Sequence, residues 1–104
     1  MKKSTDTNIG LIRRSLCEQL PELQTRYGVK SLGIFGSFVR GQQKKRSDID
    51  LLVEFNDQVS VTLVNFVALE RELGKLLGQR VDLVELDTLK PVIGKRILEE
   101  VVFI

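Results

Sequence analysis

Three short apolar runs constrain the fold of this 104-residue chain more than any other feature of its sequence. They cover 29–36, 48–55 and 79–86, and their β-branched character is typical of strands. Segments with helical apolar spacing precede, separate and follow them, which gives the order helix, strand, strand, helix, strand, helix. This order predicts an α+β domain in which a small mixed β-sheet packs against helices.

Local signals place the boundaries of the first helices. Apolar side chains recur at helical spacing from Ile9 to Leu20. Pro21 is expected to break this helix, or to begin a second short helix that Gly28 stops. Residues 37–41 are expected to form a single helical turn.

A long helix is expected between the second and third strands. Ser60 can cap it, and Gly78 is expected to end it after Leu77. Its predicted apolar side consists of Val61, Val64, Leu69, Leu73, Leu76 and Leu77.

The last helix is expected over 89–101, capped by Asp87 or Thr88, with Pro91 in its first turn. The apolar end of the chain, 101–104, is expected either to complete the core or to meet a partner.

Composition narrows the class of protein. The chain is long enough for one domain over 1–104, and the polar residues 1–7 are expected to be frayed. The net charge of +2 does not indicate a nucleic-acid partner, so direct binding of nucleic acid is not expected. No stretch approaches the roughly 20 apolar residues of a membrane span.

The chain has one cysteine, Cys17, and no histidine. One thiol cannot form an internal disulfide, and with no signal-peptide pattern a reducing cytoplasm is expected. Because Cys17 lies in an apolar helical pattern, we expect a buried structural thiol. The lack of histidine excludes Ser-His-Asp triads and HExxH metal sites, so chemistry must rest on Asp, Glu, Ser, Lys, Arg or the lone Tyr27.

Two carboxylates interrupt the second apolar run. Asp48 and Asp50 are separated by one residue, so in a strand they lie on one face, about 6.6 Å apart along it, while Ile49, Leu51 and Val53 face the core. Neighbouring carboxylates repel each other, and the arrangement becomes favourable when a divalent cation lies between them. Mg²⁺ prefers carboxylate oxygens, water and substrate phosphates.

Asp82 interrupts the third run in the same way. If the second and third strands pair, Asp82 comes beside Asp48 and Asp50. Three carboxylates can then hold two metal ions about 3.5–4 Å apart, the geometry that stabilises an in-line phosphoryl displacement.

The Gly36-Ser37 turn is a candidate phosphate site. A strand that runs into a turn exposes unpaired backbone N–H groups, which bind phosphate, and glycine lets the backbone approach closely. Ser37 adds a hydroxyl, and Arg40 can reach a phosphate or pair with an aspartate. Each element also has a purely structural explanation: an ordinary turn, polar strand positions, or a surface cation.

The combination resembles a known family. Gly36-Ser37, ten residues and then Asp48-Ile49-Asp50 match the G-S-x10-D-x-D signature of the polymerase-β-like nucleotidyltransferases. Phe35, Arg40-Gly41, Ser47 and the segments 51–55 and 80–84 strengthen the match, which runs from Val29 to the C-terminus. The size and the "RILEE" segment resemble the minimal nucleotidyltransferase subgroup.

The resemblance implies a nucleotidyltransferase (polymerase-β palm-like) fold and transfer of a nucleoside monophosphate from a triphosphate to a hydroxyl with two Mg²⁺. Asp48 and Asp50 would bind both metals and the triphosphate, and Asp82 would hold the catalytic metal. The nucleotide-binding residues it implies are Gly36, Ser37, Arg40 and Ser47.

Members of the subgroup are commonly paired with a HEPN-domain RNase toxin, so the resemblance implies such a partner. It also implies that this chain acts as the antitoxin by adding AMP from ATP to a tyrosine of the toxin. Two alternatives stay open: a binding module that neutralises its partner by occlusion, or an enzyme whose acceptor is a small molecule or an RNA 3′ end. The basic loop 44–46 either attracts an acidic partner or the triphosphate, or is simply solvated.

Overall fold

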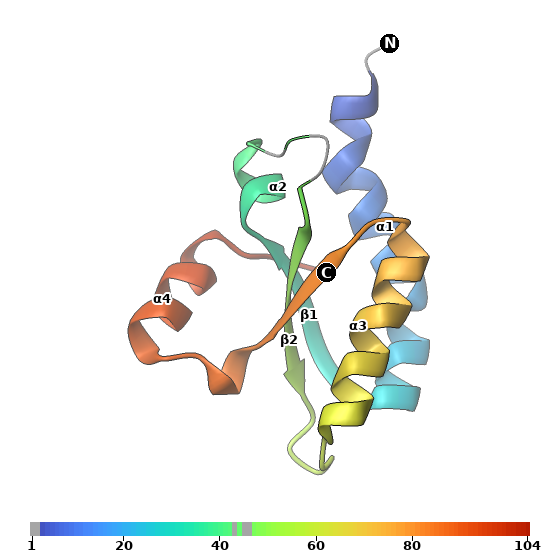
Figure 1. The fold of residues 1–104 in the computed structure, drawn as a ribbon, viewed down its shortest axis with the longest axis vertical. Coiled ribbons are helices and arrows are strands. Elements are labelled where there is room, and N and C mark those ends of the chain that lie inside the picture. The colour runs from blue at the N-terminus through green and yellow to red at the C-terminus, as the bar shows by residue number, and fades with distance from the viewer. Residues whose placement is uncertain (1–2, 43, 45–46) are drawn as a thin grey trace.

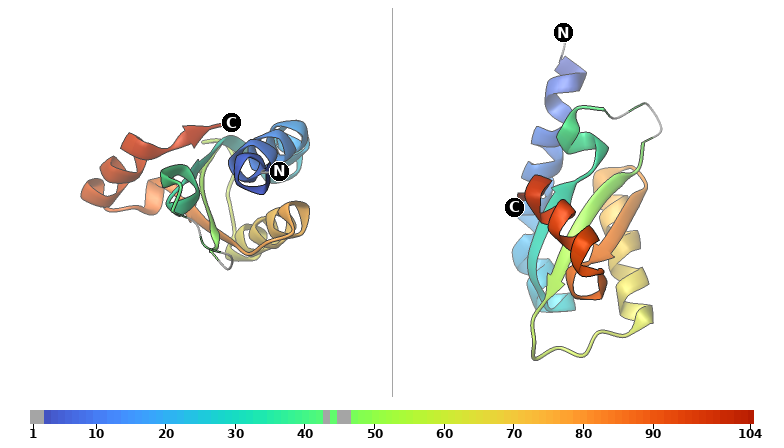
Figure 2. Two further views of the ribbon diagram at one scale, coloured as in Figure 1. Left: turned by 90° about the horizontal axis from the view of Figure 1, so that it is seen from above. Right: turned by 90° about the vertical axis from the view of Figure 1, so that its left-hand side faces the viewer.

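The computed structural model describes residues 3–42, 44 and 47–104 (Figure 1). Its elements, in chain order, are α1 (Lys3–Tyr27), β1 (Val29–Phe35), α2 (Ser37–Arg40), β2 (Ile49–Phe55), α3 (Leu63–Leu77), β3 (Val81–Glu85), the 3₁₀ turn η1 (Leu86–Thr88), α4 (Pro91–Glu100) and β4 (Val102–Phe103). The strands form one sheet in the order β3-β2-β1-β4. Helices α1 and α3 cover one face, and α4 lies on the other (Figure 2).

The sheet is mixed, as predicted. β1 pairs with β2 and with β4 in antiparallel fashion, whereas β2 and β3 are parallel. A parallel pair needs a crossover connection, and α3 supplies it. The carboxylate-bearing β2 therefore lies in the interior of the sheet, between β1 and β3.

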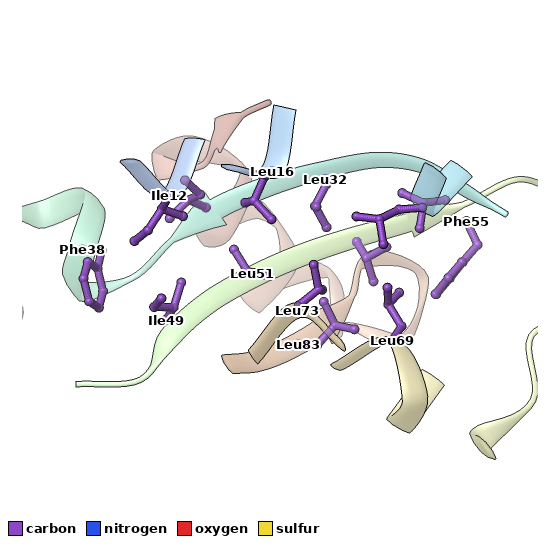
Figure 3. Packing of buried hydrophobic residues seen from close by; sticks show 14 residues of the cluster. Ile12, Leu16, Leu32, Phe38, Ile49, Leu51, Phe55, Leu69, Leu73 and Leu83 are labelled. Carbon is purple, nitrogen blue, oxygen red and sulfur yellow. The ribbon is translucent and has the colours of Figure 1, made fainter. Parts of the chain in front are cut away.

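The core lies between the sheet and the helix pair α1/α3 (Figure 3). Ile49, Leu51 and Val53 are fully buried on the face that the period-two pattern predicted. Leu69 and Leu73 of α3 are one turn apart and also fully buried. Burial of alternate β2 residues on this face leaves Asp50 on the other.

The predicted break at Pro21 is wrong, because α1 continues from Lys3 to Tyr27 with the proline inside it. Proline removes one helical hydrogen bond, but Leu16 and Leu23 on either side of it are both buried in the same core. Their packing on the sheet keeps the two halves of the helix together. The predicted boundary at Gly28 is correct, since strand β1 starts at Val29.

Cys17 is exposed, so the prediction of a buried thiol is wrong. The residues of α1 that reach the core are Ile12, Leu16 and Leu23, with Ile9 and Leu20 packed against them. Their spacing defines an apolar stripe on one side of the helix, and Cys17 lies outside that stripe, on the side that faces solvent.

The helix α3 begins later than predicted. Its N-cap is Thr62, whose hydroxyl accepts a hydrogen bond of 3.1 Å from the Asn65 N–H, and not Ser60. Phe66, Leu69, Leu73 and Leu77 follow one another at three or four residues and pack on the core. The predicted apolar side is wrong for Val64 and Leu76, which are 77% and 36% exposed. Val61 packs against the core but precedes the helix. Gly78 ends the helix in the left-handed conformation, as predicted.

Neither Asp87 nor Thr88 caps α4, because both belong to η1 and the helix begins at Pro91 after Lys90. The Thr88 hydroxyl instead donates to the Glu85 carbonyl at 2.8 Å. The apolar C-terminus completes the sheet: Val102 pairs with Ile34 and Phe103 with Gly33.

Within the described residues, none of the helices combines the length and the apolar character needed to cross a membrane.

Candidate active site

The register of the sheet brings Asp50 and Asp82 together. Asp50 lies opposite Phe35 on β1 and opposite Asp82 on the parallel strand β3, so the three residues form a row across the sheet. The row lies on the face away from the α1/α3 core. Asp48 precedes β2 by one residue and is exposed. The sequence predicted that pairing of β2 with β3 would bring Asp82 beside Asp48 and Asp50. The strands do pair, and the register places Asp82 opposite Asp50, whereas Asp48 lies just before the paired segment.

The Asp50 carboxylate is held in an unfavourable electrostatic environment. Partial burial raises its pKa above the ordinary value, and the negative charges of Asp82 and then Asp48 raise it further. The guanidinium of Arg40 acts in the opposite direction but does not cancel these effects. An uncompensated carboxylate cluster of this kind is characteristic of functional sites.

The donor set fits a hard divalent cation, because Asp48, Asp50 and Asp82 offer only carboxylate oxygens and a bound cation would remove their repulsion. Among residues 3–42, 44 and 47–104, no group of three acidic, cysteine or histidine side chains is already close enough to hold a metal ion. In this structure the three aspartates are therefore near enough for their charges to interact, but their side chains do not yet converge on one point.

Gly36 occupies a conformation that only glycine adopts readily, with φ 81° and ψ −150°. A Cβ at this position would lie 2.9 Å from the Asp50 Cγ and even closer to its Oδ2. Asp50 thus packs directly on the Gly36 backbone, and the space is available only because Gly36 has no side chain.

The phosphate-binding groups predicted at this turn have an internal partner. The Gly36 N–H donates to Glu100 Oε2 at 2.7 Å, and Arg40 Nη1 donates to both Glu100 carboxylate oxygens at 3.0 and 3.1 Å. The acidic partner of Arg40 in this structure is thus Glu100, where the sequence had suggested an aspartate or a phosphate. Sequence reasoning missed Glu100, because only the pairing of β4 with β1 brings it here.

The two serines occupy different environments. Ser37 is the first residue of α2, which is anchored by the buried Phe38. The Ser47 hydroxyl accepts a 2.7 Å hydrogen bond from the Lys44 N–H and closes a turn within the loop before β2. The predicted basic loop 44–46 falls mostly outside the described residues, which include Lys44 alone of its three members.

A cleft of about 710 Å³ lies between the aspartate face of the sheet and α4. Its polar and charged lining consists of Gly36, Arg40, Asp50, Asp82, Arg96, Glu99 and Glu100, and its apolar lining includes Leu89, Ile93 and Ile97. A cleft of this size, with both charged and apolar lining residues, suits a ligand that combines phosphates with a planar ring.

A cleft of similar size, about 760 Å³, lies around the end of α3 and the start of β3. It is lined by Arg71, Lys75 and Arg80 but contains none of the three aspartates. Because Asp50 and Asp82 line the cleft beside α4, that cleft is the candidate active site.

The sequence matches a family model described as Nucleotidyltransferase domain over residues 16–104. The protein adenylyltransferase MntA of Thermococcus cleftensis is 49% identical to this chain over 83 residues, which are 80% of this chain and 82% of that protein.

Solved structures are similar over most of the chain. One assigned as a minimal nucleotidyltransferase has a TM-score of 0.72 at 35% identity, covering 89% of this chain and 91% of its own. A chain from a complex of the tri-AMPylated Shewanella oneidensis HEPN toxin with an MNT antitoxin has a TM-score of 0.58 at 21% identity, covering 95% and 70%. At that identity the second likeness concerns the fold alone.

Proposed function

Because the chain belongs to the nucleotidyltransferase domain family, we propose that it transfers AMP from ATP to a tyrosine hydroxyl of a partner HEPN-domain RNase toxin and so acts as its antitoxin. In this reaction the acceptor oxygen attacks the α-phosphorus, the bond from the α-phosphorus to the bridging oxygen of the β-phosphate breaks, and pyrophosphate leaves. The acceptor proton passes to a carboxylate or to water.

The observation that carries the proposal is the position of Asp50, which lies opposite Asp82 in the parallel strand β3 and directly beside the Gly36 backbone. A triphosphate bound at Gly36 therefore lies next to carboxylates. Those carboxylates repel one another and also repel the phosphates, and bound cations would offset both repulsions. The arrangement of Asp50 and Asp82 therefore suits a nucleotide that carries metal ions.

Asp48, Asp50 and Asp82 are the residues that would hold two Mg²⁺. Mg²⁺ bound there would neutralise the charge that develops on the transferring phosphoryl group. Asp82 would also orient the acceptor hydroxyl. Gly36, Ser37 and Arg40 would bind the β- and γ-phosphates through an amide, a hydroxyl and a guanidinium. Ser47 would support the nucleotide from the loop before β2.

One relative supports a protein as acceptor, and a complex that shares only the fold contains an acceptor of this kind. The Thermococcus cleftensis protein is named as a protein adenylyltransferase, and the Shewanella oneidensis complex contains a HEPN toxin that carries three AMP groups. We extend the transfer of AMP to a protein from those proteins to this chain.

The mass of a co-expressed HEPN-domain partner tests the proposal. We expect one or more added AMP groups on a tyrosine when the wild-type chain is present with ATP, and none when Asp50 is replaced by asparagine. A partner that is inactive but unmodified in mass would contradict the transfer reaction and favour neutralisation by occlusion.

A further inference from the structure

On the basis of the proposed function, we propose that Glu100 sets the nucleotide specificity of the site, because its carboxylate occupies the position that the terminal phosphates of the triphosphate must take. ATP binding then requires displacement of Glu100 from Gly36 and Arg40. A nucleotide with fewer phosphates displaces it less well.

The contacts of Glu100 are those of an anion in an anion site. One carboxylate oxygen accepts from the Gly36 N–H at 2.7 Å, and the Arg40 guanidinium contacts both oxygens. Backbone amides and arginine are also the donors that phosphate oxygens use, with similar bond lengths. One set of donors cannot serve both anions fully, so Glu100 and a phosphate compete.

The fold itself positions Glu100 for this competition. Val102 of β4 lies opposite Ile34 of β1 in an antiparallel pair. Glu100 is the last residue of α4 and precedes this pair by two residues. The pairing of β4 with β1 therefore holds the backbone of Glu100 near the end of β1, from where its side chain reaches the Gly36 N–H.

Glu100 is also able to leave. Its side chain is 27% exposed and that of Arg40 is 49% exposed, so both remain accessible from the cleft. The Glu100 charge contributes to the raised pKa of Asp50, which means that the carboxylate adds repulsion to the cluster while it stays in place. A triphosphate brings more negative charge and more acceptor oxygens to the same donors than one carboxylate does.

A purely structural role for Glu100 predicts the opposite behaviour. If Glu100 only held Arg40 and Gly36 in their binding positions, its removal would leave them less ordered and ATP binding would weaken. The direction of the change in affinity therefore distinguishes competition from positioning.

Calorimetric titration of the full chain with Mg²⁺-ATP and Mg²⁺-ADP tests the competition in Glu100→Gln. We expect the dissociation constant for ATP to fall by about 3- to 10-fold, since a charged acceptor is replaced by a neutral one. The preference for ATP over ADP is expected to narrow. Glu99→Gln is the matched control, because Glu99 lines the same cleft and carries the same charge but does not make the Gly36 and Arg40 contacts.

The outcomes separate this inference from the proposed function. If the wild type binds ATP and Glu100→Gln binds it no more tightly than Glu99→Gln does, only the role of Glu100 is overturned. If neither the wild type nor Glu100→Gln takes up ATP, the proposed function fails as well.

A second measurement uses the wild-type chain and so does not depend on the folding of a variant. The amide resonance of Gly36 is expected to shift on addition of Mg²⁺-ATP, because its hydrogen-bond acceptor changes from a carboxylate to a phosphate. A Gly36 amide that stays at its free position in the ATP-saturated protein would also overturn the inference.

Discussion

Asp50→Asn is expected to lower the rate of AMP transfer by at least about 100-fold, the scale associated with loss of one electrostatic group at a transferring centre. Asp50 is the carboxylate that lies beside Asp82 and against Gly36, so its loss removes the link between the metal ligands and the phosphate turn. The measurement is transfer of labelled AMP from ATP to the partner protein. Asp57→Asn, an identical change in the exposed turn at the other end of β2, should leave transfer unchanged.

The same variant is expected to be at least as stable as the wild type. The folded-state pKa of Asp50 is raised above 3.8, chiefly by burial, so the folded protein binds the proton more tightly than the unfolded chain does. The wild type therefore loses stability as pH rises from 3.8 through the raised pKa, and this loss persists above it. Thermal unfolding of both proteins should show that the excess stability of Asp50→Asn over the wild type grows as pH rises from 3.8 through the raised pKa of Asp50. An advantage that shrinks as pH rises would contradict the assigned environment of Asp50.

Gly36→Ala is expected to damage both stability and activity. The substitution forces alanine into a backbone region that costs about 1–3 kcal/mol and places its Cβ 2.9 Å from the Asp50 Cγ. Asp50 must move, so AMP transfer should fall by about 100-fold, as it does when the carboxylate is removed. Thermal unfolding should occur several degrees lower, at about 4–8 °C per kcal/mol for a chain near this size.

Gly78→Ala separates the effect of backbone strain from the effect on the site. Gly78 also has a positive φ, 68°, but a Cβ there meets nothing within 4 Å. We expect a stability loss of about 1–2 kcal/mol with normal transfer. Equal losses of transfer in the two alanine variants would mean that the Gly36 effect arises from general destabilisation and not from the displacement of Asp50.

The polymerase-β-like nucleotidyltransferase fold predicted from the Gly-Ser and Asp-Ile-Asp spacing is confirmed. The strands were predictable because they are short apolar runs, and because Asp50 falls at the position that points away from Ile49, Leu51 and Val53. The position of Asp82 beside Asp50 followed once β2 and β3 were assumed to pair. Only the three-dimensional structure shows that the two strands pair and in which register, because neither strand's own sequence determines its parallel partner.

Other features depend on tertiary packing that no local pattern contains. The helix α1 passes through Pro21 because residues on both sides of it are buried in one core. Ser60 and Thr62 have equivalent capping chemistry, and the path of the chain after β2 decides between them. Strand β4 has only two residues, too few to show a period, and without it the contact of Glu100 with Gly36 could not be foreseen.

Calorimetric titration of ATP into the wild-type chain with and without Mg²⁺ provides the decisive comparison. If the three aspartates and the Gly36 turn form one metal-nucleotide site, ATP uptake should depend on Mg²⁺ and should be lost when Asp50 and Asp82 are both replaced by asparagine. ATP uptake that is equally strong without Mg²⁺, or that survives in the double variant, would contradict the site described here.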